Sequence, residues 1–392
     1  MLIISFDAVG DEEFDQLMEY PVFSAFSKQT AVHREVRTLF VSNTYPIHVS
    51  IATGLHPRDH GLISNTGSFP EKTPIWNSRE SLIRAKTLWQ AAAGQGLDIA
   101  AVFWPVTAYS KTVRYNIPEV IALPGKNQII TSLKAGSTLL QLKMVLKFRK
   151  LLDIKNQPGR DIFAAACMGH ILRKHNPGLA LMHFTAYDSL CHRYGKGSVE
   201  LKKAFESLDR NLGILLEAAG ETRDIVILSD HSQINVHTTL KPNDMLVEKG
   251  LLRVDNDNYI PGTSGCYFEC CGGSAFFHAG SLPGEKIDEL RRNIEQSEGF
   301  RRYLTDEEMQ CSGYASASFG FCPQPGFIYV AYDSGHKAEH GYPTDMPGYN
   351  VFYMTKGFGL PPGSVTKGGS LLDIAPLVAS RMGLVLPTSP PS

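Results

Sequence analysis

The chain opens with MLIISFD (residues 1–7), a short apolar run rich in branched side chains that ends in the carboxylate of Asp7. This pattern is typical of a buried β-strand with an acidic residue at its carboxyl end. Two later apolar runs end in the same way, just before Asp188 and just before Asp230-His231. Ligands of open α/β sheets bind at the carboxyl ends of the strands. We therefore expect these side chains to meet at one edge of a sheet.

The wider pattern predicts an α/β fold. Helical periodicity covers about 11–28, 84–95, 159–175, 198–219 and 370–382, and apolar strand patterns cover about 2–6, 98–104, 178–184, 224–229 and 350–354. Because the two kinds of pattern alternate, we expect a mostly parallel central sheet with helices on both faces.

The catalytic core is predicted to be discontinuous, made of residues 1–235 and 338–392. A lid-like insertion covers about residues 107–158, and an inserted cap covers residues 236–337, a region rich in short strands and turns. The chain enters and leaves the cap beside candidate metal ligands. We therefore expect the cap to lie over the site and to influence which substrate fits.

Within the first insertion, Ser132 to Lys150 is a candidate basic amphipathic helix. Its cations are Lys134, Lys143, Lys147, Arg149 and Lys150. A role at a membrane surface and a role as a solvated lid are both compatible with this composition, and the pattern alone favours the lid.

Aspartate and histidine are suitable ligands for Zn²⁺. A single carboxylate after a strand is often only a helix cap, but here Asp188 is followed by His192 and Asp230 by His231, and His340 precedes Gly-Tyr late in the chain. This set is large enough for two tetrahedral ions, an arrangement used in phosphoryl transfer. His336 is an alternative to His340, which is favoured because it carries the Gly-Tyr sequel.

Thr44 is the candidate nucleophile. Pro46 fits the first turn of a helix that continues to Thr53, and Gly54 can close that helix. A hydroxyl at a helix start lies near free backbone N–H groups and the positive end of the helix dipole, which favour an incoming phosphate. On local sequence alone Thr44 would be an ordinary N-cap residue, and the metal-ligand set is what favours the catalytic reading.

The run TYPIHVSIATGLHP (residues 44–57), followed by HGLISN (residues 60–65), closely resembles the nucleotide pyrophosphatase/phosphodiesterase branch of the alkaline phosphatase superfamily. The resemblance continues in PIW (74–76), FWP (103–105), DSLCH (188–192), SDH (229–231) and HGY (340–342). It spans roughly residues 1–110, 178–235 and 338–385.

The resemblance implies an alkaline-phosphatase-like core that binds two Zn²⁺ ions, with other divalent ions such as Mn²⁺ as alternatives. One ion would be held by Asp188, His192 and His340. The other would be held by Asp7, Asp230 and His231, with Thr44 as its exchangeable ligand and as the nucleophile. Asn65 matches the residue that donates to a phosphoryl oxygen. Two positions depart from the family: Ile47 where asparagine is usual, and Ser232 where glycine is usual.

The implied activity is hydrolysis of phosphodiester or pyrophosphate bonds through a threonyl-phosphoryl intermediate, on a small phosphodiester or nucleotide. Phe69 and Trp76 follow Thr44 without a clear arginine set, which favours diesters. Alternatives are a phosphomonoesterase or phosphonate hydrolase, which an arginine clamp near Asn65 would favour, then a phosphomutase, and then a non-catalytic metal-binding protein.

Composition sets further expectations. A net charge of −1 over 392 residues argues against a stable complex with nucleic acid. No stretch approaches the roughly 20 apolar residues of a membrane span. The chain opens on a core strand rather than a secretory signal, and it has an odd number of cysteines, seven, without regular spacing; both features predict a cytoplasmic protein with reduced thiols. Cys266, Cys270 and Cys271 are compatible with a thiolate metal site, but a strand pair with buried thiols is favoured.

Overall fold

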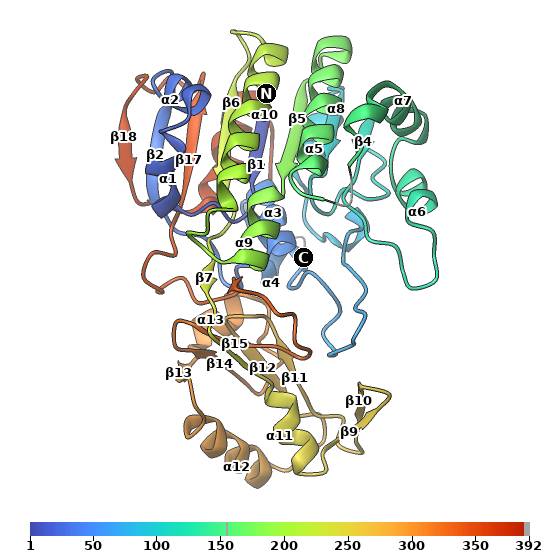
Figure 1. Ribbon diagram of the computed structural model, residues 1–392, viewed down its shortest axis with the longest axis vertical. Coiled ribbons are helices and arrows are strands. Elements are labelled where there is room, and N and C mark those ends of the chain that lie inside the picture. The colour runs from blue at the N-terminus through green and yellow to red at the C-terminus, as the bar shows by residue number, and fades with distance from the viewer. Residues whose placement is uncertain (154–155, 388–392) are drawn as a thin grey trace.

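A computed structural model describes residues 1–153 and 156–387 of the chain. Its centre is an eight-stranded sheet with the strand order β18-β2-β17-β6-β1-β5-β3-β4 (Figure 1). These strands are β1 (Leu2–Phe6), β2 (Ala31–Val36), β3 (Ile99–Val102), β4 (Tyr115–Ile117), β5 (Leu179–Phe184), β6 (Ile225–Ser229), β17 (Val351–Lys356) and β18 (Val365–Lys367). Strand β17 runs antiparallel to both neighbours, and the other adjacent pairs are parallel. The predicted mostly parallel α/β sheet is confirmed.

Alternate side chains of β1 enter two different cores. Leu2, Ile4 and Phe6 lie in the core under one set of helices, whereas Ile3 lies in the core on the opposite face. The first set contains α1 (Phe14–Leu17), α2 (Pro21–Ser27), α8 (Gly159–His175), α9 (Ala186–Tyr194) and α10 (Leu201–Ala219); the second contains α3 (Thr44–Thr53), α5 (Leu88–Gly94) and α14 (Ile374–Met382). Burial on both faces explains why the strand reads as a continuous apolar run.

Two predicted helices are divided in the structure. The helix expected over 11–28 consists of η1 (Asp11–Glu13), α1 and then α2, because Pro21 starts a new helix at its first position. The helix expected over 132–150 consists of α6 (Gln128–Ala135), α7 (Thr138–Phe148) and η3 (Arg149–Leu151). The break falls at Gly136, whose backbone is extended, and a Cβ atom there would lie 2.6 Å from the carbonyl oxygen of Asn116.

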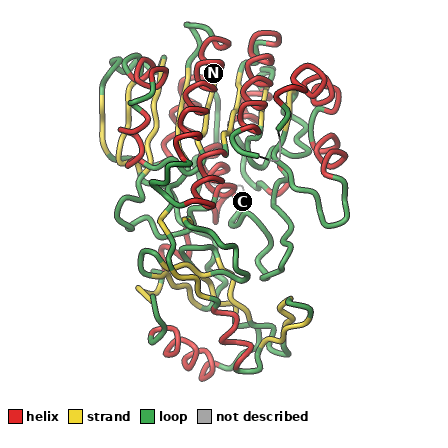
Figure 2. The backbone as a smooth tube through the Cα atoms, viewed as in Figure 1, coloured by secondary structure: helices red, strands yellow, loops and turns green. Residues whose placement is uncertain are grey.

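Residues 238–330 form a smaller body beside the carboxyl ends of the central strands (Figure 1). It has its own apolar core and is built from short strands joined by loops (Figure 2). Its four-stranded antiparallel sheet has the order β11-β12-β14-β13. Its strands are β8 (Thr238–Leu240), β9 (Leu252–Asp255), β10 (Asn258–Pro261), β11 (Tyr267–Cys270), β12 (Ala275–His278), β13 (Phe300–Tyr303), β14 (Phe319–Pro323) and β15 (Phe327–Tyr329), and its helices are α11 (Pro242–Glu248), α12 (Gly284–Glu295) and α13 (Asp306–Cys311).

The chain enters this body through β7 (Ile234–Asn235) and returns through β16 (Ala338–Glu339), and these two strands pair antiparallel. The two segments that connect this body to the central sheet therefore lie side by side, one just after His231 in the sequence and the other just before His340. The remaining short helices are α4 (Pro57–His60), η2 (Glu80–Leu82) and η4 (Leu371–Asp373).

Candidate metal centre

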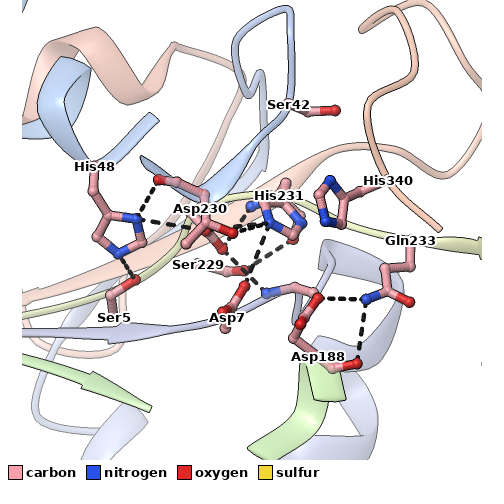
Figure 3. A network of polar contacts seen from close by, with 12 residues as sticks. Ser5, Asp7, Ser42, His48, Asp188, Ser229, Asp230, His231, Gln233 and His340 are labelled. Carbon is pink, nitrogen blue, oxygen red and sulfur yellow. Dashed lines mark hydrogen bonds and ion pairs between the residues drawn. The ribbon is translucent and has the colours of Figure 1, made fainter. Parts of the chain in front are cut away.

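The predicted ligands and the predicted nucleophile converge at the carboxyl edge of the central sheet. We call this set the ligand cluster: Asp7, Thr44, Asp188, His192, Asp230, His231 and His340. Figure 3 shows five of the predicted ligands there: Asp7, Asp188, Asp230, His231 and His340. Asp7 follows β1, Asp188 and His192 lie on α9 just after β5, and the Asp230-His231 pair follows β6. Because these strands are parallel, their carboxyl ends lie at the same edge, and residues far apart in the sequence lie close together there.

Helix α9 presents Asp188 and His192 on one face, because residues four apart in a helix are neighbours. The start of this helix is fixed by Asp161, whose carboxylate accepts hydrogen bonds from the backbone N–H groups of Thr185 (3.2 Å) and Ala186 (2.8 Å). The Nε2 atom of His192 lies 3.2 Å from Oδ1 of Asp188, and its Nδ1 atom donates to the carbonyl of Ala338 at 2.8 Å. This second contact leaves Nε2 available to a metal ion.

The side chains of Asp188 and His192 on α9 stabilise each other's charged form. Burial opposes the charged form of His192, but the carboxylates of Asp188 and Glu339 outweigh it and raise the pKa of His192 to about 10. Burial likewise opposes ionisation of Asp188, yet the neighbouring His192, and then His340 and His231, hold the pKa of Asp188 below its usual range. Without a metal ion, these two residues form an ion pair.

A second group centres on His231. Its Nε2 atom lies 3.4 Å from Oδ1 of Asp7 and 3.4 Å from Oδ2 of Asp230. The other oxygen of Asp230 accepts hydrogen bonds from the backbone N–H groups of Ala8 (3.1 Å) and His231 (2.9 Å), which fixes the carboxylate. Burial raises the pKa of Asp7 well above its usual value, and the nearby charges of Asp188 and Asp230 raise it further. Burial lowers the pKa of His231 to about 4.

Thr44 is the first residue of α3, and its hydroxyl does not cap the helix. Asn43 occupies the N-cap position, and Oγ1 of Thr44 lies 3.2 Å from Nε2 of His231. The helix ends where predicted, at Gly54, which adopts a left-handed conformation with φ of 73°. The hydroxyl therefore faces the ligand cluster rather than its own helix.

The residues present fit a pair of divalent metal ions. Several buried polar atoms of the cluster have no hydrogen-bond partner among the described residues: Oδ1 of Asp7, Oδ2 of Asp230, Nδ1 of His231 and Nδ1 of His340. Unpaired polar atoms are costly inside a protein, and carboxylates that crowd one another with raised pKa values call for a positive charge. Candidate ligand atoms of Asp7, Asp230 and His231 lie within 4.8 Å of one another, as do those of Asp188, His231 and His340. Oxygen and imidazole donors in this combination suit Zn²⁺.

The geometry separates the two histidines considered for the late ligand. The ring of His336 lies 4.3 Å from that of His192, but only His340 also approaches His231, at 4.3 Å, and only His340 belongs to the candidate ligand groups among the described residues. His336 is more exposed, and its Nδ1 atom contacts Oε2 of Glu339 at 2.8 Å. This arrangement favours His340 as the ligand.

Asn65 lies beside the candidate nucleophile. Its Oδ1 atom accepts a hydrogen bond from the backbone N–H of Tyr45 at 2.8 Å, which leaves its amide group to donate. The two departures from the family pattern are both buried. Ile47 packs in the core, and the Ser232 hydroxyl occupies the space beside Gly10, where a Cβ atom would lie 2.5 Å from Oγ of Ser232.

Three further titratable residues contact the cluster without having been predicted to do so. Oε1 of Glu339 lies 3.5 Å from Nε2 of His340 and 3.7 Å from Nδ1 of His192. On the other side, Nε2 of His183 lies 3.3 Å from Oδ2 of Asp7, and Nδ1 of His48 lies 3.6 Å from Oδ2 of Asp230. A signal was present for two of them: His183 is a polar residue in an apolar strand, and Glu339 directly precedes a predicted ligand.

This fold, with acidic and histidine side chains at the strand ends and a threonine at a helix start, is that of the alkaline phosphatase superfamily. Within it, the chain belongs to the type I phosphodiesterase/nucleotide pyrophosphatase family, whose model matches residues 1–349. The predicted family membership is confirmed.

Individual relatives are distant. Human ectonucleotide pyrophosphatase/phosphodiesterase family member 1 is 23% identical over 222 residues, which cover 54% of this chain and 21% of the human protein. The chain therefore matches about a fifth of that relative's length. A bis(5′-adenosyl)-triphosphatase from Pongo abelii is 21% identical over 408 residues, covering 98% of this chain and 78% of the relative.

Solved structures share the fold. Murine ectonucleotide pyrophosphatase/phosphodiesterase 5 superposes with a TM-score of 0.71 at 14% identity, covering 100% of this chain and 97% of that chain. An inactive threonine-to-alanine variant of the murine protein, in complex with AMP, has a TM-score of 0.70. Among the described residues of this chain, no helix has the length and hydropathy needed to cross a bilayer.

Proposed function

We propose that this chain is a two-metal phosphodiesterase or nucleotide pyrophosphatase that uses Thr44 as its nucleophile. The single observation that carries the proposal is the position of the Thr44 hydroxyl. It is buried at the start of α3, is not used as a cap, and lies 3.2 Å from a histidine that also contacts two carboxylates. The same role is supported by a relative, murine ectonucleotide pyrophosphatase/phosphodiesterase 5, of which a threonine-to-alanine variant in complex with AMP is inactive.

The two ions would be held by Asp188, His192 and His340, and by Asp7, Asp230 and His231. Bound there, they would lower the pKa of a hydroxyl and offset the charge that builds up on phosphoryl and leaving-group oxygens. Zn²⁺ is the ion that best suits these donors, and Mn²⁺ is an alternative.

The chain's own residues account for the rest of the reaction. Thr44 is held by α3 so that its oxygen can attack phosphorus in line, forming a threonyl-phosphoryl ester while the bond to the leaving group breaks. Asn65 donates from its free amide to a non-bridging oxygen without adding a titrating group. Attack by water on the threonyl ester then frees Thr44 and completes a double displacement.

The surroundings of Asn65 favour a diester over a monoester. A monoester presents a dianionic group that needs an additional cation, whereas a diester carries one negative charge and an organic substituent. Trp76 is partly exposed and packs edge-on against the buried Tyr45, with ring centroids 5.3 Å apart, so it offers an aromatic side chain close to Thr44 for that substituent.

The test compares an aryl phosphodiester, or a nucleoside ester of an aryl phosphate, with the matching aryl monoester. Both are assayed on one preparation loaded with zinc, and its metal content is measured. We expect a higher kcat/KM for the diester. A preference for the monoester would instead favour the phosphomonoesterase alternative.

We further propose that residues 236–337 act as the cap that selects the substrate, because the chain enters and leaves this region beside the ligand cluster. A cytoplasmic location is also proposed. All seven cysteines are unpaired thiols, which supports a reducing environment.

A further inference from the structure

Residues 121–152, which we call the insert, expose an unusual concentration of apolar side chains. They comprise the loop before α6, then α6, α7 and η3, and they lie at the β4 edge of the central sheet (Figure 1). Of the nineteen large apolar side chains exposed among the described residues, ten belong to this segment. They are Ile121, Leu123, Ile129, Ile130, Leu139, Leu142, Val145, Leu146, Leu151 and Leu152.

Helix α7 is apolar on two opposite faces. Met144 points into the core and is 1% exposed, whereas Leu139 and Leu146 are 84% and 74% exposed. Leu139, Leu142 and Leu146 are spaced by three and four residues, so they form one stripe along the outward face of the helix. A solvated lid helix would carry polar side chains in that stripe.

The insert is also the most one-sided charged region of the chain. It has six cationic residues and no aspartate or glutamate, although the whole chain has a net charge of −1. The cations are Lys126, Lys134, Lys143, Lys147, Arg149 and Lys150. None of them forms an ion pair with a described residue. Lys143 also faces Lys174 of α8, and this like charge lowers the pKa of Lys143.

We propose that the insert docks onto an anionic lipid surface, with the Leu139–Leu142–Leu146 stripe in the interface and the lysines against lipid phosphates. Exposed leucines beside unpaired cations are the composition of helices that lie in a membrane interface. Long lysine side chains reach from the apolar boundary to the head groups, and each cation near an anionic leaflet adds to the attraction.

A second copy of the chain fits this surface less well. A two-fold contact would place the same residues of both copies together, so six cations from each would meet without an acidic partner. An anionic bilayer offers an apolar interior for the exposed leucines and negative charge for the lysines.

The insert also shares a cavity with a residue close to the candidate nucleophile. A cavity of about 470 Å³ is lined by Ile121, Ile130 and Lys134 of the insert and by Trp76. Trp76 in turn packs against Tyr45, the residue after Thr44. The docking proposal itself does not depend on the proposed activity.

The experiment is flotation of the full chain with vesicles of phosphatidylcholine, with and without roughly 30% phosphatidylglycerol, in about 0.1 M salt. We expect roughly tenfold stronger binding to the anionic vesicles, with loss of that binding in about 0.5 M salt. The double variant Leu139→Gln/Leu146→Gln should lose roughly tenfold in binding. The matched control Val199→Gln/Val385→Gln, which changes side chains that are 78% and 76% exposed elsewhere, should bind as the unaltered chain does.

The charges are tested by Lys143→Gln/Lys147→Gln/Lys150→Gln, which should also lose binding, against Lys28→Gln/Lys203→Gln/Lys241→Gln, which should not. Circular dichroism and thermal unfolding confirm that each variant is folded. Several results would overturn the proposal. They are equal binding to neutral and anionic vesicles, no binding to either, displacement from vesicles by millimolar inorganic phosphate, or self-association that only the insert variants abolish.

Discussion

The ligand cluster and the three cysteines of the smaller body contain residue types that bind metals, but they differ in how those residues are arranged. In the ligand cluster, donors from separate segments face one another, and several of their atoms lack a hydrogen-bond partner among the described residues. Near Cys266, Cys270 and Cys271, the neighbouring carboxylate of Glu269 is satisfied by the hydroxyl of Tyr314 at 2.6 Å and by His278 at 3.3 Å.

The three cysteines lie in or next to one strand and pack into the structure rather than facing one another. Cys270 ends β11, which pairs with β12, and Cys266 and Cys271 flank that strand and are buried. No candidate group of ligands among the described residues includes a cysteine. The favoured sequence interpretation, a strand pair with buried thiols, agrees with this arrangement. Ligand-type residues therefore indicate a metal centre only where the fold makes them converge on one another.

The largest expected effect comes from removing a predicted ligand. His340→Ala should reduce metal content from two ions to about one per chain and lower kcat/KM by roughly a hundredfold or more, because it opens one of the two sites. The matched control is His336→Ala, which removes a neighbouring histidine outside the cluster. Retention of both ions in His340→Ala with loss of one in His336→Ala would reverse the assignment of the late ligand.

A smaller effect concerns pH. In the metal-free protein the pKa of His192 is raised to about 10, so this imidazole is protonated at neutral pH. A metal ion must displace that proton, so zinc affinity should rise by about tenfold per pH unit between roughly pH 6 and 9. Zinc titrations over this range would show it, and Glu339→Gln should weaken the dependence by removing one of the carboxylates that raise this pKa. Affinity independent of pH would contradict the ion pair.

The smallest effect on metal binding is expected in the smaller body. Replacing Cys266, Cys270 and Cys271 with alanine should leave metal content at two ions and activity near its original value. The cavities left by the buried thiols should lower the free energy of unfolding by about 1–3 kcal/mol, as measured by urea unfolding. Loss of a full equivalent of zinc would show that the cysteines form one of the sites.

Much of the fold followed from the sequence because buried parallel strands leave a plain pattern. The strands that precede Asp7, Asp188 and Asp230 were all predicted, and with them the edge of the sheet where the cluster forms. Strand β2 was missed because its pattern is mixed: Ala31 and Val32 are buried, whereas Arg34 and Glu35 are not. Such a strand is recognised only once its neighbours are known.

Contacts between residues far apart in the sequence could not be predicted from local sequence patterns. Glu339 reaches His192 only because β7 and β16 pair, and no local periodicity encodes that pairing. The outward stripe of α7 was equally hidden, because a helix that is apolar on two sides does not reveal which side faces the core. In this insert, Met144 is buried and Leu146 is exposed, although both are apolar.

The most direct test of the central claim is a joint measurement of metal content and diester hydrolysis on Thr44→Ala. Only the attacking oxygen and its methyl group are removed, so the variant should still bind two ions per chain while losing nearly all turnover. Thr44→Ser should retain partial activity. Near-original hydrolysis by Thr44→Ala with both ions bound would contradict the account and remove Thr44 from the reaction.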